Sequence, residues 1–437
     1  MNLSQALRLP KTPRLALVGA GGKTTALFQL ARQLPPPVLV AATTHLGADQ
    51  TRLADSHWIA ERPADLAGLE EKLQGVILVT GPVEADRTTG LAAKALAWLH
   101  ELGDSHGLPL LVEADGSRRR PLKAPAATEP PIPEFAQTVV VVAGLSGLGR
   151  PLTDEFVHRP EVFARLGGLG PGDPVTPEAL ARVLLHREGG LKSIPPGARR
   201  VALLNQADTP DLQSLGGKLA GDLLGEYAAV LVGALERDLL QAFEQTAGIV
   251  LAGGEARRFG SPKQLLDYHG RPFVRAVAET ALAAGLSPVV VVSGANAGQV
   301  EDAVRDLPVR MAHNPDWPSG QSSSLQAGLR ALPEQAGAAI FLLADQPQVT
   351  PTVLRALADR HGLDLAPVVA PLVDGRRANP VLFDRVTFPD LLSLTGDVGG
   401  RAVFSKFPLT YLPWHDASLL LDVDRPEDYE KLLDRRI

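Results

Sequence analysis

The sequence predicts an α/β protein with two domains, each built on a mostly parallel sheet that helices cover on both faces. Runs rich in Val, Leu and Ile alternate with amphipathic helical patterns along the chain, which is typical of parallel strands joined by crossover helices. The 437 residues exceed the roughly 250–300 at which a single hydrophobic core stops growing. We therefore expect a boundary near 244–247, with domains over 1–245 and 246–437.

The expected elements follow from these runs in chain order. Strands of the first domain are expected at 14–18, 38–42, 76–80, 110–113, 138–143, 201–205 and 230–235. Its helices are expected at 24–34, 91–102, 177–186 and 212–224. Strands of the second domain are expected at 248–251, 288–293, 309–313, 339–343 and 365–371, with amphipathic helices between them. Both domains thus open with a strand that leads into a glycine-rich turn.

The composition argues against several classes of protein. No apolar run approaches the roughly 18 residues that span a bilayer, and residues 1–13 lack the apolar stretch of a secretory signal. We therefore expect no membrane segment and a cytoplasmic location. The net charge of −6 is unfavourable for general nucleic-acid binding. Because the chain has no cysteine, a metal ion must be held by oxygen or imidazole ligands.

The turn that opens the second domain fits a triphosphate site. The strand at 249–251 runs into Ala252, Gly253 and Gly254, and Arg258 and Lys263 follow. Small residues let backbone N–H groups approach phosphates, and the two cations can neutralise phosphate oxygens. Taken alone, such a turn is equally consistent with an ordinary β-α connection.

Two acidic positions fit a magnesium site in the same domain. Asp345 follows the strand at 339–343, at the sheet edge where ligands of open α/β sheets bind. Mg²⁺ usually takes one or two carboxylates together with substrate phosphates. Asp424, in the acidic turn 421–428, can supply the second carboxylate, although its place before Pro426 also fits a helix N-cap.

With these motifs, the second half resembles the molybdenum cofactor cytidylyltransferases (MocA-like), a branch of the nucleotidyltransferases that includes the guanylyltransferases of the same pathway. The resemblance covers the whole half and rests on 251–266, 319–325, 345–347, 379–380, 396–401 and 422–428. It implies a Rossmann-like nucleotidyltransferase domain that transfers a cytidylyl group from CTP to molybdopterin with Mg²⁺ and releases pyrophosphate.

The resemblance also implies a role for each matched residue. The triphosphate would be bound by Gly253, Gly254, Arg258 and Lys263, and Leu251 and Ala252 would also contact the nucleotide. Asp345 and Asp424 would hold Mg²⁺, and Arg258, Lys263 and Asp345 would be the catalytic groups. The nucleoside pocket would be lined by Gly320, Ser323 and Ser324, and the acceptor would face Asn379, Pro380, Asp397 and Arg401.

One position departs from the cytidylyl pattern. Cytidylyl members read Leu-Ala-Ala-Gly at the opening turn, whereas this chain has Gly253 in the third position, as guanylyl members do. The missing methyl group leaves room for a purine, so GTP is an alternative donor. We expect CTP, because 262–266, the serine run 322–324 and the loop 396–401 resemble the cytidylyl members.

The turn that opens the first domain fits a shortened P-loop. Its residues are Gly19, Ala20, Gly21, Gly22, Lys23, Thr24 and Thr25. A full P-loop has glycine six positions before the lysine, where this chain has Leu17. Backbone amides and the lysine would bind phosphate, and the threonine hydroxyl would bind Mg²⁺. The alternative is a tight turn without a ligand.

Three further residues of the first domain fit a nucleotide site. Asp115 lies just after the strand at 110–113 and is a candidate metal ligand, directly or through water. Asn205 and Asp208 resemble the Asn-Lys-X-Asp element with which GTPases bind guanine, but Gln206 replaces the lysine. The alternative for these two is a strand end followed by a turn.

The first half resembles the YqeC-type accessory proteins of selenium-dependent molybdenum hydroxylases. The resemblance spans about 14–235 and rests on 43–45, 113–118, 121–125 and 157–161. It implies nucleotide binding and a role in hydroxylase maturation, with an apo-molybdenum hydroxylase as a further partner. His45 is a candidate for a phosphate or metal contact, and the alternative is a structural histidine after a strand.

Two rival functions remain open at this point. A sugar-nucleotide pyrophosphorylase would use a sugar phosphate in place of molybdopterin. A non-catalytic carrier or chaperone would bind the molybdenum cofactor and hand it to an apo-hydroxylase, with the nucleotide pockets as switches.

Overall fold

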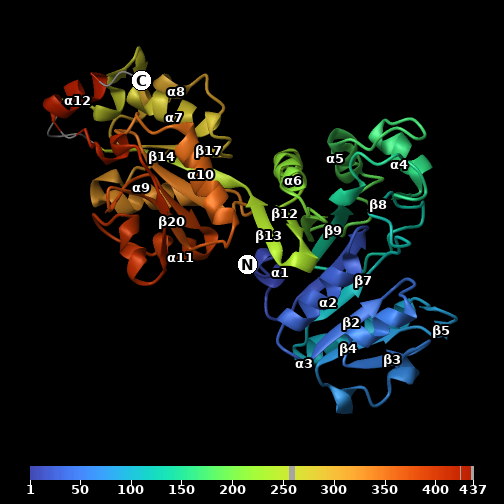
Figure 1. Cartoon of the computed structure of the whole chain (residues 1–437). Helices are drawn as coiled ribbons and strands as arrows, with labels where there is room; N and C mark the ends of the chain where they lie inside the picture. Colours follow the sequence, from blue (N-terminus) through green and yellow to red (C-terminus); the bar gives the residue numbers. More distant parts are fainter. Residues whose placement is uncertain (255–260, 424, 435–437) are drawn as a thin grey trace. The chain divides into compact units, whose positions relative to one another are not determined.

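The chain folds into two compact units. The computed structural model describes residues 1–254, 261–423 and 425–434, and its units are Met1–Phe243 and Glu244–Ile437. Figure 1 traces both units and labels their elements. Arg258 and Asp424, two of the predicted site residues, lie outside the described residues.

The first unit is built on a nine-stranded sheet in the order β13-β12-β11-β9-β1-β7-β2-β4-β3. Its strands are β1 (Arg14–Gly19), β2 (Val38–Ala42), β3 (Ser56–Ile59), β4 (Val76–Thr80), β7 (Leu110–Glu113), β9 (Thr138–Gly144), β11 (Arg199–Asn205), β12 (Ala229–Ala234) and β13 (Leu239–Glu244). The pairs from β12 through to β3 are parallel. Consequently the carboxyl ends of β1, β7 and β2 meet at one edge of the sheet.

Helices bury the apolar central strands of this sheet. They are α1 (Leu3–Ala6), α2 (Lys23–Gln33), α3 (Ala93–His106), α4 (Pro160–Gly167), α5 (Pro177–Leu185) and α6 (Pro210–Leu223). Thr176 and Thr209 begin α5 and α6 by accepting hydrogen bonds from backbone N–H groups of the first turn, each followed by proline. Two short ribbons, β5 (Val83–Glu84) with β6 (Arg87–Thr88) and β8 (Leu122–Lys123) with β10 (Val157–His158), lie outside the main sheet.

The second unit is built on an eight-stranded sheet in the order β18-β17-β14-β19-β22-β20-β21, with β23 also paired to β20. The strands are β14 (Thr246–Ala252), β17 (Val289–Ser293), β18 (Arg310–His313), β19 (Ala338–Leu343), β20 (Val368–Val373), β21 (Arg376–Arg377), β22 (Val381–Asp384) and β23 (Leu409–Pro413). From β18 to β19 the pairs are parallel, whereas β22 and β21 run antiparallel to their neighbours.

Two apolar cores cover the opposite faces of the second sheet. Alternate residues of β20 belong to different cores: Ala370 to one, Val369 and Val373 to the other. The helices are α7 (Phe273–Ala283), α8 (Ala297–Val304), α9 (Gln321–Arg330), α10 (Pro351–Gly362), α11 (Phe388–Leu392) and α12 (Pro426–Leu433), and β15 (Asp267–Tyr268) pairs with β16 (Arg271–Pro272). Helix α9 packs on the face of the sheet that carries Ala370, and this placement positions the candidate site.

The mixed α/β class and the mostly parallel sheets are confirmed, and every strand expected from the sequence is present. The strands that the sequence analysis missed are short or lie at sheet edges, such as β3 and β23, where apolar runs are interrupted by polar residues. Among the described residues, no helix is both long enough and apolar enough to cross a membrane.

Candidate functional site

The second unit has a cleft of about 630 Å³ at the carboxyl ends of β14 and β19, a size typical of small-molecule sites. It is lined by Leu251, Ala252, Gly253, Gly254, Lys263, Gln264, Trp317, Pro318, Ser319, Gly320, Gln321, Ser324, Leu343, Ala344, Asp345 and Asp397. The cleft therefore brings together most of the residues that were predicted for the triphosphate, the metal and the nucleoside.

Two residues that the sequence analysis did not single out hold the glycine turn in place. Gln264 is buried, and its Nε2 donates a hydrogen bond to the backbone oxygen of Gly254 at 3.1 Å. A Cβ atom on Gly294, just after β17, would lie 2.5 Å from the backbone oxygen of Gly253. Only glycine at position 294 allows this approach, so the turn is fixed against the neighbouring strand.

Gly253 makes room for a hydroxyl group of the cleft. A Cβ atom at this position would lie 3.1 Å from Ser324 Oγ, which is closer than nearly all contacts of real Cβ atoms. The methyl group of the Leu-Ala-Ala-Gly pattern would therefore press on Ser324.

A buried asparagine orients the predicted nucleoside residues. Asn314 is 3% exposed, and its Nδ2 donates to Ser323 Oγ at 2.8 Å and to Ser324 Oγ at 3.0 Å. Ser323 Oγ in turn donates to the Gly320 carbonyl at 2.8 Å, at the start of α9. Ser324 lines the cleft, whereas Ser323 is not among the lining residues. In the sequence, Asn314 is a single asparagine that follows a strand, a position typical of a surface turn, so the pattern does not mark it as part of a site.

The loop that carries Asp397 packs against the start of α9. Gln321 N–H donates to Asp397 Oδ1 at 3.2 Å, and Ser322 Oγ donates to the Gly396 carbonyl at 2.7 Å. A Cβ atom on Gly320 would lie 2.5 Å from the backbone nitrogen of Asp397. Asp397, predicted for the acceptor, therefore lies next to the predicted nucleoside residues.

Asp345 lies in the cleft just after β19, and the turn that follows it anchors the C-terminal acidic segment. Gln346 is 2% exposed, and its Nε2 donates to Asp422 Oδ1 at 2.5 Å. Gln348 Nε2 donates to the Leu421 carbonyl at 2.8 Å. These two glutamines hold the chain up to Val423, which is fully buried, against the residues that follow Asp345.

The remaining predicted acceptor residues lie away from the cleft lining. Asn379 and Pro380 join β21 to β22 through a cis peptide bond. Arg401 is exposed in the 3-10 helix Gly400–Ser405, directly after the loop that carries Asp397. None of the three is among the residues that line the cleft.

In the first unit, the predicted phosphate turn joins β1 to α2. Gly19, Gly21 and Gly22 have positive φ, and Thr24 and Thr25 belong to the first turn of α2, which begins at Lys23. A Cβ atom on Gly21 would lie 2.4 Å from Gly144 at the end of β9. These positions therefore require glycine whether or not a phosphate binds.

Asn205 braces this turn with both ends of its amide. Its Nδ2 donates to the Gly21 carbonyl at 2.8 Å, and its Oδ1 accepts from Leu235 N–H at 3.1 Å. The side chain is 5% exposed. Asp208 is exposed, and Gln206 Oε1 accepts from Ser146 Oγ at 2.6 Å. Asn205 therefore holds the turn in place through these hydrogen bonds, while Asp208 lies at the surface.

Two carboxylates at the carboxyl end of β7, Glu113 in the strand and Asp115 just after it, meet the start of α2. Thr24 Oγ1 donates to Glu113 Oε2 at 3.0 Å, and Lys23 Nζ lies 3.7 Å from Glu113 and 3.4 Å from Asp115. Burial raises the pKa of Glu113 even though the ammonium of Lys23 opposes this shift. Glu113 was not among the predicted metal ligands, yet it is the carboxylate that contacts the Thr24 hydroxyl.

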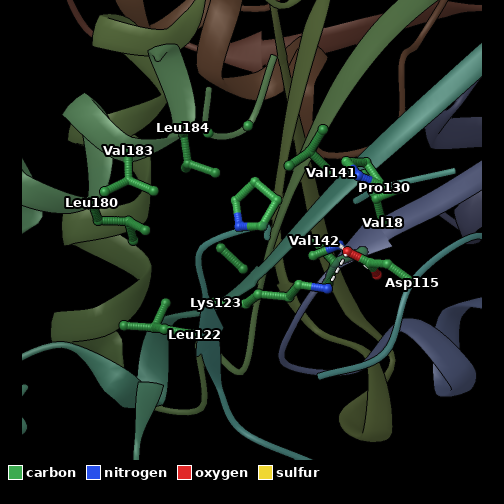
Figure 2. A pocket seen from close by; sticks show the side chains of 15 residues that line it. Val18, Asp115, Leu122, Lys123, Pro130, Val141, Val142, Leu180, Val183 and Leu184 are labelled. Carbon is green, nitrogen blue, oxygen red and sulfur yellow. Dashed lines mark hydrogen bonds and ion pairs between the residues drawn. The ribbon is translucent and has the colours of Figure 1, made fainter. Parts of the chain in front are cut away.

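Asp115 lies between two buried lysines. Its carboxylate accepts from Gly19 N–H at 3.0 Å and pairs with Lys123 Nζ at 2.8 Å, and Figure 2 shows this ion pair at one end of a cavity. Lys123 Nζ also contacts Glu129 at 2.8 Å and the Gly116 carbonyl at 2.6 Å. An ammonium has three donors, so these three acceptors satisfy Lys123 completely.

The cavity beside this pair is small and mostly apolar. Figure 2 shows Leu180, Val183 and Leu184 of α5 on one side and Val141 and Val142 of β9 on the other. Its volume of about 30 Å³ has room for one or two water molecules. The lysines and carboxylates at its end therefore form an internal ion network next to the phosphate turn.

The burial and the positive charges around His158 predict that the free energy of unfolding depends on pH. Burial, and then the charges of Arg159, Lys123 and Arg118, lower the pKa of His158 to about 4 from 6.5. As pH falls from 6.5 towards 4, the unfolded chain binds a proton that the folded chain does not, so the free energy of unfolding decreases through this window. Urea unfolding across this range should show a weaker decrease in His158→Gln. An imidazole that titrates near 6.5 by NMR would contradict this prediction.

His45 is exposed, and its Nδ1 lies 2.9 Å from the Thr88 carbonyl. This contact holds the segment after β2 against β6, as an ordinary structural histidine would. The described residues contain no group of three or more His, Asp or Glu side chains arranged to hold a metal.

Family models match both units. The MobA-like NTP transferase domain matches residues 248–411, and the YqeC protein family matches residues 15–161. The uncharacterized protein YqeC of Escherichia coli (strain K12) is 33% identical over 204 residues, which are 44% of this chain and 75% of that protein. The match to YqeC falls on the unit with the phosphate turn, and the NTP transferase match falls on the unit with the cleft.

Relatives of the second unit carry different names. Nicotine blue oxidoreductase of Paenarthrobacter nicotinovorans is 34% identical over 195 residues, 43% of this chain and 95% of that protein. A probable molybdenum cofactor guanylyltransferase of Chloroflexus aggregans is 35% identical over 116 residues, 26% of this chain and 51% of that protein. Because YqeC is 33% identical over three quarters of its own length, the chain belongs to the YqeC family in its first half, and its second half carries a MobA-like NTP transferase domain, so the chain is a fusion of the two.

Proposed function

We propose that the second unit transfers a cytidylyl group from CTP to molybdopterin and releases pyrophosphate. The observation that carries this proposal is the cleft in which the glycine turn, Lys263, Asp345 and the start of α9 share one lining. Backbone amides of the turn and Lys263 would bind the phosphates, and Gly320 and Ser324 would contact the nucleoside. The relative named as a molybdenum cofactor guanylyltransferase supports a molybdenum cofactor precursor as the acceptor.

The residues of the cleft fit a magnesium ion. Asp345 offers oxygen ligands, which Mg²⁺ prefers, at the same wall as the turn that would hold the phosphates. Gln346 anchors Asp422, two residues before the other predicted ligand, Asp424, which is outside the described residues. When bound, the ion would offset the negative charge that develops on the phosphates.

The proposed reaction needs no side chain as a base. The second pKa of a phosphate monoester is near 6, so the acceptor phosphate is largely dianionic at neutral pH. One of its oxygens attacks the α-phosphorus, the bond to the bridging oxygen breaks, and pyrophosphate leaves with the electron pair. The role of the protein is to hold the two reactants in line and to neutralise charge with Lys263 and the predicted Arg258.

We infer CTP as the donor and GTP as the alternative. The start of α9 and the Asp397 loop support CTP because they carry the sequence patterns of cytidylyl members. Gly253 supports GTP, because it relieves Ser324 of a contact that a methyl group would impose. Pyrophosphate release should therefore be measured with CTP, GTP and ATP, at saturating molybdopterin and Mg²⁺. We expect CTP to give the highest kcat/KM, and a preference for GTP would overturn the choice.

The identity of the product decides between the remaining functions. Mass spectrometry after incubation with CTP, molybdopterin and Mg²⁺ should find molybdopterin extended by one cytidine monophosphate. Transfer to a sugar 1-phosphate without transfer to molybdopterin would indicate a sugar-nucleotide pyrophosphorylase. Stoichiometric delivery of cofactor to an apo-hydroxylase without pyrophosphate would indicate a carrier.

The relative named nicotine blue oxidoreductase supports a second candidate, a redox reaction in the same cleft. The test is NADH or NADPH consumption with a heterocyclic dye, measured in parallel with pyrophosphate release. We expect pyrophosphate release alone, because the cleft combines a lysine, a carboxylate and a glycine turn, which suit a triphosphate.

For the first unit, we propose a nucleotide-binding accessory role. Thr24 and Glu113, in contact at 3.0 Å, would serve the metal ion of a bound nucleotide, and the turn at 19–23 would bind its phosphates. The cytoplasm is the proposed location, and an apo-molybdenum hydroxylase is the proposed partner that receives the finished cofactor.

A further inference from the structure

Two arginines of the second unit lack a carboxylate partner among the described residues. Arg377 in β21 is partly buried and Arg401 is exposed, and within the described parts of the chain neither forms an ion pair. The guanidinium of Arg377 lies over the ring of Phe404, 5.2 Å from its centroid. This stacking holds the cation in place without neutralising it.

Strand register places Arg377 on the face of the sheet that α9 covers. Arg377 pairs with Leu372 of β20, and Tyr411 of β23 pairs with Ala370. Residues in register share a face, and residues two apart along a strand do so as well. Ala370 belongs to the core that also contains Leu325 of α9, so Arg377 and the exposed Tyr411 lie on the α9 side.

A continuous set of contacts joins the cleft to Arg377. A Cβ atom on Gly399 would lie 2.6 Å from Oε1 of Gln321, a cleft residue, and one on Gly400 would lie 2.8 Å from the ring of Phe383. Phe383 stacks with Phe404 at 6.2 Å between centroids. The segment from Asp397 to Arg401 therefore leads from the cleft to the ring that carries Arg377.

The charge of Arg401 acts on Arg377 at this position. Burial, and then the charge of Arg401, lower the pKa of Arg377, while Tyr411 opposes the shift. Two cations that repel each other, and that have no ion-pair partner in the described ranges, favour an anion between them. Guanidinium groups suit phosphate because their planar forks match its oxygens.

We propose that Arg377 and Arg401 form the subsite for the phosphate monoester of the acceptor, with Tyr411 beside it for a flat ring system. The inference rests on the proposed function of the cleft and adds Arg377 as a residue that determines acceptor specificity. The acceptor phosphate would be held here by two cations, while the triphosphate occupies the glycine turn and Lys263.

Arg376 supplies a matched control. It is the adjacent residue of β21, it is exposed, and it pairs with Val373, which belongs to the core on the opposite face. The test compares wild type, Arg377→Met, Arg377→Lys and Arg376→Met in pyrophosphate release, with CTP and molybdopterin varied separately. The loss of a charge-assisted contact should raise the KM for molybdopterin roughly 10- to 100-fold in Arg377→Met.

The other kinetic constants should change little if the subsite is correct. We expect the KM for CTP in Arg377→Met to stay within about twofold of wild type, Arg377→Lys to recover part of the molybdopterin affinity, and Arg376→Met to match wild type. An unchanged KM for molybdopterin in Arg377→Met would overturn the subsite. An equal rise in the KM for CTP would also overturn the subsite. Weaker inhibition by pyrophosphate, with no change in the KM for molybdopterin, would do the same.

A binding measurement separates this inference from the proposed function. Molybdopterin binding is followed by fluorescence without nucleotide, and glucose 1-phosphate serves as a second acceptor in the kinetic assay. If wild type uses only the sugar phosphate, the proposed function fails, and the subsite stands if Arg377→Met raises the KM for that acceptor. If wild type uses molybdopterin and Arg377→Met binds it equally well, the subsite fails alone. If neither protein binds molybdopterin and Arg377→Met leaves the KM for the sugar phosphate unchanged, the subsite is overturned.

Discussion

Replacing Asp345 with asparagine should lower kcat for pyrophosphate release by roughly 1,000-fold, which corresponds to about 4 kcal/mol of transition-state stabilisation. The side chain lies in the cleft wall just after β19, and asparagine keeps its shape while removing the charge that would bind a metal ion. The fold should remain intact, because Asp345 is partly exposed to solvent. Circular dichroism and thermal unfolding should therefore match wild type.

The control for this variant is Glu301→Gln, which removes an exposed carboxylate from α8 and should keep full activity. The KM for CTP and the dependence of rate on Mg²⁺ concentration should be recorded for both proteins. Near-normal turnover of Asp345→Asn would remove the metal assignment from this residue.

Replacing Lys123 with methionine should lower the free energy of unfolding of the first unit by about 3–5 kcal/mol. The lysine is 2% exposed, and it neutralises Asp115 and Glu129, which are 3% and 24% exposed. Without it, Asp115 retains Lys23 at 3.4 Å and Glu129 retains Arg159 at 2.8 Å, but each carboxylate loses its shared partner. The Gly116 carbonyl also loses a donor.

Hydrogen exchange in peptides from β1, β7 and β9 under increasing urea would measure this loss for the first unit alone. Lys94→Met, which changes an exposed lysine of α3, should stay within about 0.5 kcal/mol of wild type. If Lys123→Met also cost less than about 1 kcal/mol, the ion network would contribute little to stability, contrary to its burial.

The fold was predictable where local patterns decide it. Central strands such as β1 and β19 are buried on both faces and therefore read as continuous apolar runs. The strands β21 and β23 escaped notice because they are short or partly exposed, and only their pairing with β20 defines them. Strand pairing is a long-range property that residue patterns do not contain.

The sequence predicted the motifs that line the cleft, but it did not predict the residues that hold those motifs in place. Glycines and a strand-end carboxylate mark the turn and Asp345 directly in the sequence. Gln264, Gly294 and Asn314 act by contacts with residues outside their own elements, so each resembles an ordinary residue until the fold is known. In the first unit, the choice between Glu113 and Asp115 as the partner of Thr24 depends on how α2 sits against β7, which spacing does not reveal.

Crystals of the full chain grown with Mn²⁺ and a CTP analogue that resists transfer would test the central claim directly. We predict an anomalous peak beside Asp345, with the triphosphate between that residue, the turn at 253–254 and Lys263. Nucleotide and metal found only at the turn of the first unit, beside Thr24 and Glu113, or in the second unit away from Asp345, would contradict the account.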